Sequence, residues 1–127
     1  MDTNFRDPAV QAWPKMPQVV NEAAARLHTQ YGNEGMPSEA LKREIERIGD
    51  YGRDSVVPSD YCYNVINRAS SSFRHRVLVR VRRGRYKYVG PNHVYTGPIM
   101  WRPKQENERQ VGSWSNGICG LELDPRG

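Results

Sequence analysis

The sequence predicts an α+β domain of the winged helix-turn-helix class, with three helices, a basic β-hairpin wing and an irregular C-terminal extension. Apolar residues follow helical spacing early in the chain and then alternate strictly over 73–82. The expected order is two helices, a short strand, a third helix, a strand and a hairpin, which is the order of a winged helix. The 127 residues fit one such domain at 17–104, between an N-terminal arm at 1–16 and an extension at 105–127.

The first two helices are predicted from apolar stripes and stop signals. The first covers 17–31 and ends before Gly32; its stripe is Val20, Ala23, Ala24, Leu27 and Tyr31. The second has Ser38 as its N-cap and ends at Gly49; its stripe is Leu41, Ile45 and Ile48. Its remaining charges are mixed in sign, which favours a solvated face over a binding face.

A third helix is predicted after a short β-type run at 55–57. It would begin at Ser59, which can cap it, and end near Asn67. Three polar or aromatic positions at i, i+3 and i+7 would form one exposed stripe on it: Tyr61, Asn64 and Arg68. An aromatic ring, an amide and a guanidinium on one stripe indicate a helix that contacts a ligand.

The wing is predicted from period-two alternation. Over 73–82 one face carries Phe73, His75, Val77, Val79 and Val81, and the other carries Arg74, Arg76, Leu78, Arg80 and Arg82. The turn lies at Arg83–Gly84, and a second strand returns over 85–89. Beyond Gly90, frequent proline and glycine predict no regular structure, and we assign no element to 112–127.

The charge distribution suggests the partner. Between Tyr61 and Gln105 there are ten basic residues and no acidic one, whereas the other nine basic and all fourteen acidic residues lie elsewhere. This segment therefore carries +10 in a chain of net charge +5. Its basic residues are Arg68, Arg74, Arg76, Arg80, Arg82, Arg83, Arg85, Lys87, Arg102 and Lys104. Such a segment, interleaved with aromatic residues, is typical of a surface that binds a polyanion, and nucleic acid is the first hypothesis.

Several residues are candidates for DNA contact. On the wing, guanidinium and ammonium groups suit phosphate oxygens: Arg82, Arg83, Arg85 and Lys87, with Arg74, Arg76 and Arg80 on the same face. The alternative for the wing is a charged hairpin that only keeps a strand edge soluble. On the third helix, Asn64 and Asn67 could pair with adenine, and Tyr61 and Tyr63 could pack in the groove. Equally, Ser59 and Asn67 could serve only as caps, and one tyrosine could belong to the core.

A second aromatic group could sense a methyl group on a base. It comprises Tyr88, Tyr95 and Trp101. Packing of the C-terminal tail in the core is the alternative for each of the three.

The sequence gives little reason to expect an enzyme. Cys62 and His75 lie on different predicted elements, and nothing pairs them as nucleophile and base. Neither the cysteines nor the three histidines have metal-ligand spacing, so we expect no metal and no cofactor. Cys62 and Cys119 are expected to be reduced. Without a long apolar run or a signal-peptide stretch, the protein is expected to be soluble, without a membrane partner, and cytoplasmic.

Two motifs carry a family resemblance: VPSDYCYNVIN at 57–67 and RGRYKY-x-GPN-x-x-YTGP-x-x-W at 83–101. The chain resembles, over about 17–114, a winged-helix module of modification-dependent restriction endonucleases, where it is usually fused to an HNH-type nuclease. The resemblance implies a reader of N6-methyladenine, with Tyr61, Tyr63, Asn64 and Asn67 at the major groove. It also implies a nuclease domain or subunit as a candidate partner. Nuclease motifs are absent from this chain, which leaves a stand-alone reader or one domain of a nuclease.

The expected function is therefore non-catalytic binding of double-stranded DNA, with reading of methylated adenine in restriction or defence as its finer form. The alternatives are a phage or bacterial regulator whose basic face binds an acidic protein, and a winged-helix repressor. Binding of single strands or RNA also stays open, because aromatic residues among basic ones suit unpaired bases.

Overall fold

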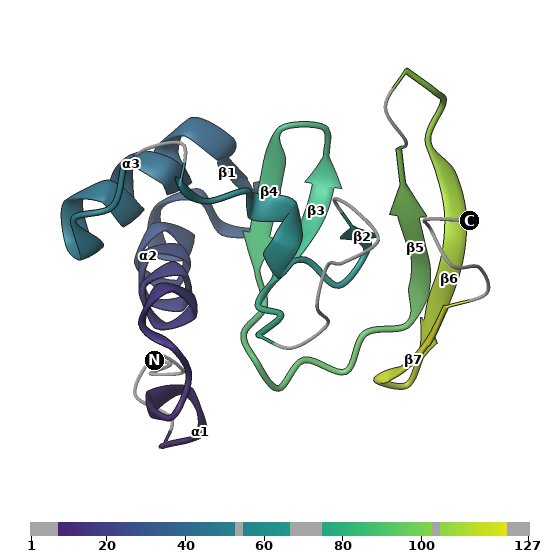
Figure 1. The fold of residues 1–127 in the computed structure, drawn as a ribbon, viewed down its shortest axis with the longest axis horizontal. Coiled ribbons are helices and arrows are strands. Elements are labelled where there is room, and N and C mark those ends of the chain that lie inside the picture. The colour runs from purple at the N-terminus through teal and green to yellow at the C-terminus, as the bar shows by residue number, and fades with distance from the viewer. Residues whose placement is uncertain (1–7, 53–54, 67–74, 103–104, 122–127) are drawn as a thin grey trace.

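The computed structural model describes residues 8–52, 55–66, 75–102 and 105–121, and its fold is not a three-helix winged helix-turn-helix. Two small sheets stand side by side, with the helices on one flank (Figure 1). The first sheet has the order β1-β4-β3, from Met36–Pro37, Arg85–Tyr88 and Leu78–Arg82. The second has the order β2-β5-β6-β7, from Val65–Ile66, Gly97–Trp101, Arg109–Ser115 and Ile118–Leu121.

The first two predicted helices are confirmed. They are α2 (Lys15–Tyr31) and α3 (Ser38–Gly49), and a single turn, α1 (Pro8–Gln11), precedes them. Helix α2 ends as predicted, with Gly32 at a positive φ of 60°. None of the helices in these described ranges combines the length and apolar character that crossing a bilayer requires.

The ends of α3 differ in part from the prediction. Pro37, not Ser38, occupies the N-cap position, and no side chain caps the helix there. At the other end, Gly49 allows close packing against α2, because a Cβ at this position would lie 2.8 Å from both Val19 Cγ1 and the ring of Tyr51. Gly49 is therefore needed for space as much as for helix termination.

The predicted third helix is wrong. Pro58–Tyr61 forms one 3-10 turn, after which Cys62 forms a bridge to Leu78 and the chain bends at residues 63 and 64 before it enters β2. The run from Cys62 to Ile66 has its buried side chains in two different cores: Cys62 and Val65 in the first, Tyr63 and Ile66 in the second. The bend at residues 63 and 64 lies between the bridge of Cys62 to Leu78 and the pairing of β2 with β5, so neighbouring side chains enter different cores. Residues 55–57 do not form the predicted strand either.

The segment at 61–66 joins the two sheets. On one side, Val77 N–H donates to Tyr61 O and Tyr63 N–H donates to Leu78 O, both at 2.9 Å. On the other side, Val65 pairs with Met100 of β5 in a parallel register. The two sheets are thus connected through this short segment.

The C-terminal part is not an irregular extension, because it forms β5, β6 and β7. Strands β6 and β7 are joined at Asn116–Gly117, where both residues have positive φ, 50° and 83°. Asn-Gly between two strands is a strong hairpin signal that the sequence prediction missed.

The hairpin of the predicted wing is confirmed, but its first strand begins at Leu78, and residues 75–77 do not belong to it as the alternation had predicted. Strands β3 and β4 pair in antiparallel fashion around the turn at Arg83–Gly84. The strict alternation of faces fails at the start of β3, since Val77 and Leu78 are both buried. Phe73 and Arg74 lie outside the described residues.

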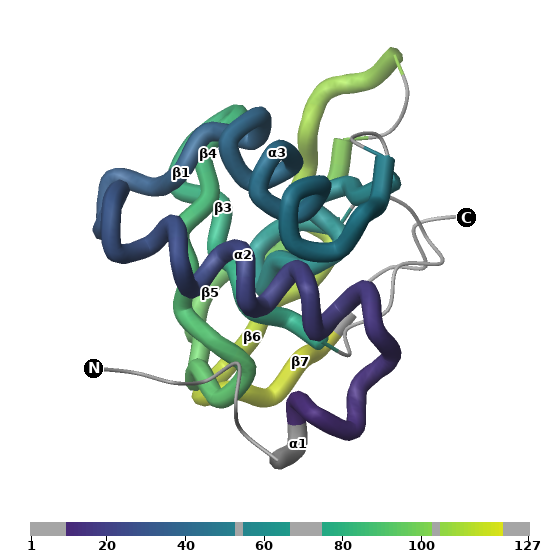
Figure 2. Tube along the Cα trace, turned by 90° about the vertical axis from the view of Figure 1, so that its left-hand side faces the viewer, coloured from purple at the N-terminus to yellow at the C-terminus, as the bar shows by residue number. Residues whose placement is uncertain are grey.

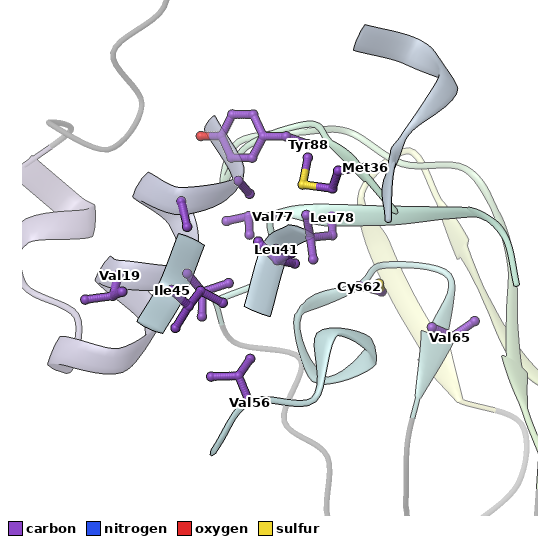
Figure 3. Close-up of a cluster of buried hydrophobic side chains, with 13 residues drawn as sticks. Val19, Met36, Leu41, Ile45, Val56, Cys62, Val65, Val77, Leu78 and Tyr88 are labelled. Atoms are coloured by element: carbon purple, nitrogen blue, oxygen red, sulfur yellow. The ribbon is translucent and has the colours of Figure 1, made fainter. Parts of the chain in front are cut away.

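Two hydrophobic cores flank the joining segment. Figure 3 shows the first, where Val19, Leu41 and Ile45 of the helices meet Leu78 and Tyr88 of the first sheet. The second, within the second sheet, comprises Tyr63, Ile66, Ile99, Val111 and Trp114. Both cysteines are free, as predicted, with Cys62 buried and Cys119 exposed.

Candidate nucleic-acid interface

A basic cleft lies between the β3–β4 hairpin and the second sheet. It consists of two adjacent depressions of about 650 and 380 Å³, which share four lining residues: Arg80, Arg83, Arg102 and Glu108. The first depression is also lined by Asn64, Val81, Arg82 and Asn107, and the second by Ser59, Val65, Ile66, Gly84 and Tyr86. In Figure 1 the hairpin turn and the C-terminal end of β5 both lie toward the upper end of the molecule.

The hairpin's backbone brings its arginines to this cleft. Gly84 has a φ of 78°, which suits the tight turn. The pairing register shifts between Arg80 and Arg82, and this irregularity leaves Val81 45% exposed. An extra residue of this kind increases local strand twist. Arg82 and Arg83 therefore line the cleft from the strand end and the turn.

Asn64 lines the cleft, and its side-chain amide pairs with the backbone of β3 as a peptide group would. Its Nδ2 donates to Arg80 O at 2.8 Å, and its Oδ1 accepts from Arg80 N–H at 2.8 Å. The side chain thus continues the pairing along β3 where the joining segment leaves it for β5. Its amide is engaged with the backbone. The sequence prediction, in which a helix presents this amide to a base, is therefore wrong.

Glu108 supplies the one carboxylate among the described lining residues. Its Oε2 accepts a hydrogen bond from Arg80 Nη2 at 2.7 Å, with the two side chains 34% and 24% exposed. A carboxylate and a phosphate oxygen bind a guanidinium in the same way. Glu108 therefore occupies a position on Arg80 that a phosphate could take.

The other wing residues lie apart from the cleft. Arg85 Nη1 donates to Gly35 O at 2.8 Å and so ties β4 to the loop before β1. Lys87 is absent from the described lining of both depressions, and its positive charge instead contributes to a lowered pKa of His93. Of the four wing cations predicted to contact phosphate, two line the cleft, Arg82 and Arg83.

Arg76 does not line the basic cleft. It is 3% exposed, and its Nη1 donates to Asp60 O at 2.6 Å. Burial lowers its pKa to about 10, which still leaves it charged at neutral pH. The remaining predicted contact residues, Asn67, Arg68 and Arg74, lie outside the described residues.

The two tyrosines of the predicted third helix lie inward. Tyr63 is 5% exposed, and its hydroxyl donates to Gly90 O at 3.2 Å. Burial raises the pKa of this hydroxyl. Tyr61 is partly buried and packs on the first core. Both are placed as packing residues, which was the alternative that the sequence left open for one of them.

The second aromatic group is divided between the two cores. Tyr88 is buried in the first, where its hydroxyl donates to Asn21 Oδ1 at 2.8 Å. Tyr95 and Trp101 pack on the second, and Arg109 Cζ lies 5.1 Å from the centre of the Trp101 ring. The three rings therefore do not form one wall around a methyl group.

Sequence reasoning missed several cleft residues. Arg80 was expected on the wing, but Arg102 was not assigned a contact, although its charge in the acid-free segment was a usable signal; the meeting of the two depends on pairing between distant strands. Asn107 and Glu108 carried no local signal. In the described ranges, no three side chains of the metal-binding types are close enough to hold an ion.

Residues 16–121 match the sequence model of a family described as "Domain of unknown function (DUF7225)". The "Uncharacterized protein YnaC" of Bacillus subtilis (strain 168) is 36% identical over 90 residues, which are 70% of this chain and 34% of that protein. The chain thus spans about a third of the length of this curated relative. No solved structure matches the chain. Since the match to the family covers most of its length, the chain belongs to the DUF7225 family.

Proposed function

We propose that this chain is a non-catalytic protein that binds double-stranded DNA through phosphate contacts in the basic cleft. The observation that carries the proposal is that Arg80 and Arg83 of the first hairpin meet Arg102, which follows β5, around two adjacent depressions, with Arg82 beside them. Guanidinium groups match phosphate oxygens in bidentate geometry. A DNA-binding role also implies an intracellular location.

The Arg80–Glu108 ion pair adds a condition to this binding. A phosphate that binds Arg80 through Nη2 has to compete with the carboxylate of Glu108, since that oxygen already lies 2.7 Å from Arg80 Nη2. The pair is partly exposed, so solvent screens it and the exchange costs little. Glu108 would then pair with Arg80 when DNA is absent.

Salt dependence tests the proposal directly. With three to four phosphate contacts, the logarithm of the association constant should fall with the logarithm of salt concentration at a slope of about −3. Fluorescence anisotropy of a labelled duplex, measured over a series of salt concentrations, gives this slope. Duplex binding that stays weak even at low salt would contradict the proposal and favour an acidic protein as the partner.

Single substitutions locate the site. Arg83→Ala and Arg102→Ala should each weaken duplex binding for all sequences and make the slope shallower by about 0.9. Arg26→Ala is the matched control, because Arg26 lies on α2, is half exposed and pairs with Glu22, and its loss changes the net charge equally. Equal effects from all three variants would show a general charge effect and reject the cleft as the site.

Reading of methylated adenine is the finer part of the proposal and is supported only by the motif resemblance at 57–67 and 83–101. It is tested with two duplexes of one sequence, with and without N6-methyladenine. Tighter binding of the methylated duplex supports the reading of methylated adenine. Equal affinities for the two duplexes would refute that reading but not the proposal of DNA binding. Single strands of the same sequence form a third arm, in which a preference for unpaired bases would replace the duplex proposal.

A further inference from the structure

A second hollow, the aromatic pocket, lies at the other end of the molecule and shares no described lining residue with the basic cleft. Its volume is about 450 Å³, within the range of small-molecule sites. It is lined by Trp13, Tyr63, His75, Arg76, Pro91, His93, Trp114 and Gly117. In Figures 1 and 2 the contributing regions near α1, β7 and the β4–β5 connection lie toward the lower end, whereas the hairpin turn lies at the upper end.

Buried rings form the floor of the pocket and are fixed in place. Tyr63 and Trp114 meet edge to face, with ring centres 5.3 Å apart, and are 5% and 8% exposed. The hydroxyl of Tyr63 donates to Gly90 O, and Trp114 Nε1 donates to Tyr63 O at 2.7 Å. Because backbone hydrogen bonds hold both polar atoms, these rings do not have to reorganise to receive a ligand.

Partly buried rings form the rim. His93 lies edge-on to Tyr63, with ring centres 5.6 Å apart, and Trp13 contacts His75 with ring centres 4.6 Å apart. Rings that border a hollow keep apolar faces that a further flat ring could cover, and base–aromatic stacking is tolerant of the identity of the ring. The rim therefore suits a planar aromatic ligand.

The charge around the pocket favours an anion. Arg76 contributes a cationic wall, and none of the residues described as lining the pocket is acidic. The pKa of His93 is lowered by burial and then by the charge of Lys87, so its imidazole is mainly neutral at pH 7. A neutral imidazole can stack and can also exchange one hydrogen bond with a heterocycle.

We propose that the aromatic pocket binds a planar heteroaromatic anion of the size of a nucleoside monophosphate. The ring of the ligand stacks at the rim formed by Trp13, His75 and His93, and its anionic group lies on the side of Arg76. This site is independent of the proposed DNA-binding cleft and goes beyond it, because it would give the chain a small-molecule ligand.

Tryptophan fluorescence provides a direct assay. The chain has three tryptophans, of which Trp13 and Trp114 line the pocket, so a Trp101→Phe protein reports from the pocket alone. The four common nucleoside monophosphates are titrated into this protein, with inorganic phosphate as the probe without a ring. We expect saturable quenching by at least one nucleotide and none by phosphate. No saturable change with any nucleotide, or the same change with phosphate, would overturn the proposal.

Substitutions then separate this site from the cleft. His93→Ala and Trp13→Ala should weaken nucleotide binding about tenfold each, the loss of one stacking partner. Because Trp13 is itself a reporter, its variant is measured by calorimetry. Arg83→Ala in the basic cleft should leave nucleotide affinity unchanged. Unchanged binding in both rim variants, or loss of binding in Arg83→Ala, would place the ligand elsewhere and refute the assignment. Thermal melting of each variant confirms that it is folded.

Discussion

Asn64→Ala tests whether the Asn64 amide replaces a peptide group between the two sheets. The substitution removes two hydrogen bonds of 2.8 Å and leaves the N–H and C=O of Arg80 without these partners. Each hydrogen bond contributes about 1 kcal/mol, and each backbone group left unsatisfied costs about 1–3 kcal/mol where water cannot replace the partner. Because the site borders the cleft, water reaches it in part, and we expect a loss of about 2–4 kcal/mol in the free energy of unfolding.

The assay is thermal and urea unfolding followed by circular dichroism. For a chain of 127 residues, 1 kcal/mol corresponds to a shift of about 4 °C in the melting temperature, so the expected shift is about 8–16 °C. Asn107→Ala is the matched control, an exposed asparagine that also lines the cleft, and should melt within about 2 °C of the parent protein. A shift below about 3 °C for Asn64→Ala would refute the peptide-like role and return Asn64 to the candidates for base contact.

Three further predictions concern the cleft, the helix contact and pH. Glu108→Gln should raise duplex affinity several-fold in anisotropy titrations, because it weakens the competitor for Arg80; unchanged affinity would count against Arg80 as a phosphate contact. Gly49→Ala should destabilise the protein by about 1–3 kcal/mol in urea unfolding, because its Cβ would lie 2.8 Å from Val19 Cγ1; a neutral effect would show that α2 and α3 can separate freely. The folded pKa of His93 lies below its ordinary 6.5, so the unfolded chain binds more protons. Stability should therefore fall as pH drops below about 6.5, and less so in His93→Ala; parallel pH profiles would contradict the lowered pKa.

The parts of the fold that the sequence predicted well are those specified by neighbouring residues. Helix α3 follows from the i, i+4 spacing of Leu41 and Ile45, and the first hairpin from alternation around Gly84. The third helix failed because Ser59 and the residues after it satisfy helical start signals, whereas their actual partners lie in β3 and β5. Tertiary pairing overrode the local preference, as it does when consecutive side chains must enter two cores.

The candidate site was predictable to a similar extent. The acid-free segment directed attention to Arg82 and Arg83, which line the cleft, because charge is visible in a sequence. It could not show that Arg76 is buried, since a basic residue in an alternating strand reads as exposed. Nor could it show that Glu108, from a different segment, meets Arg80; that contact exists only after β5 and β6 have paired.

The insertion of residues 61–66 between the two sheets has a consequence for synthesis of the chain on the ribosome. Helices α2 and α3 and the first hairpin can associate once residues up to Tyr88 have emerged. Tyr63 and Ile66, however, gain their apolar neighbours Val111 and Trp114 only when β6 is also outside the exit tunnel. During that interval the nascent chain presents an uncovered aromatic and aliphatic surface, the kind of surface to which chaperones bind. The second hairpin therefore covers Tyr63 and Ile66 only after the first part of the chain has emerged.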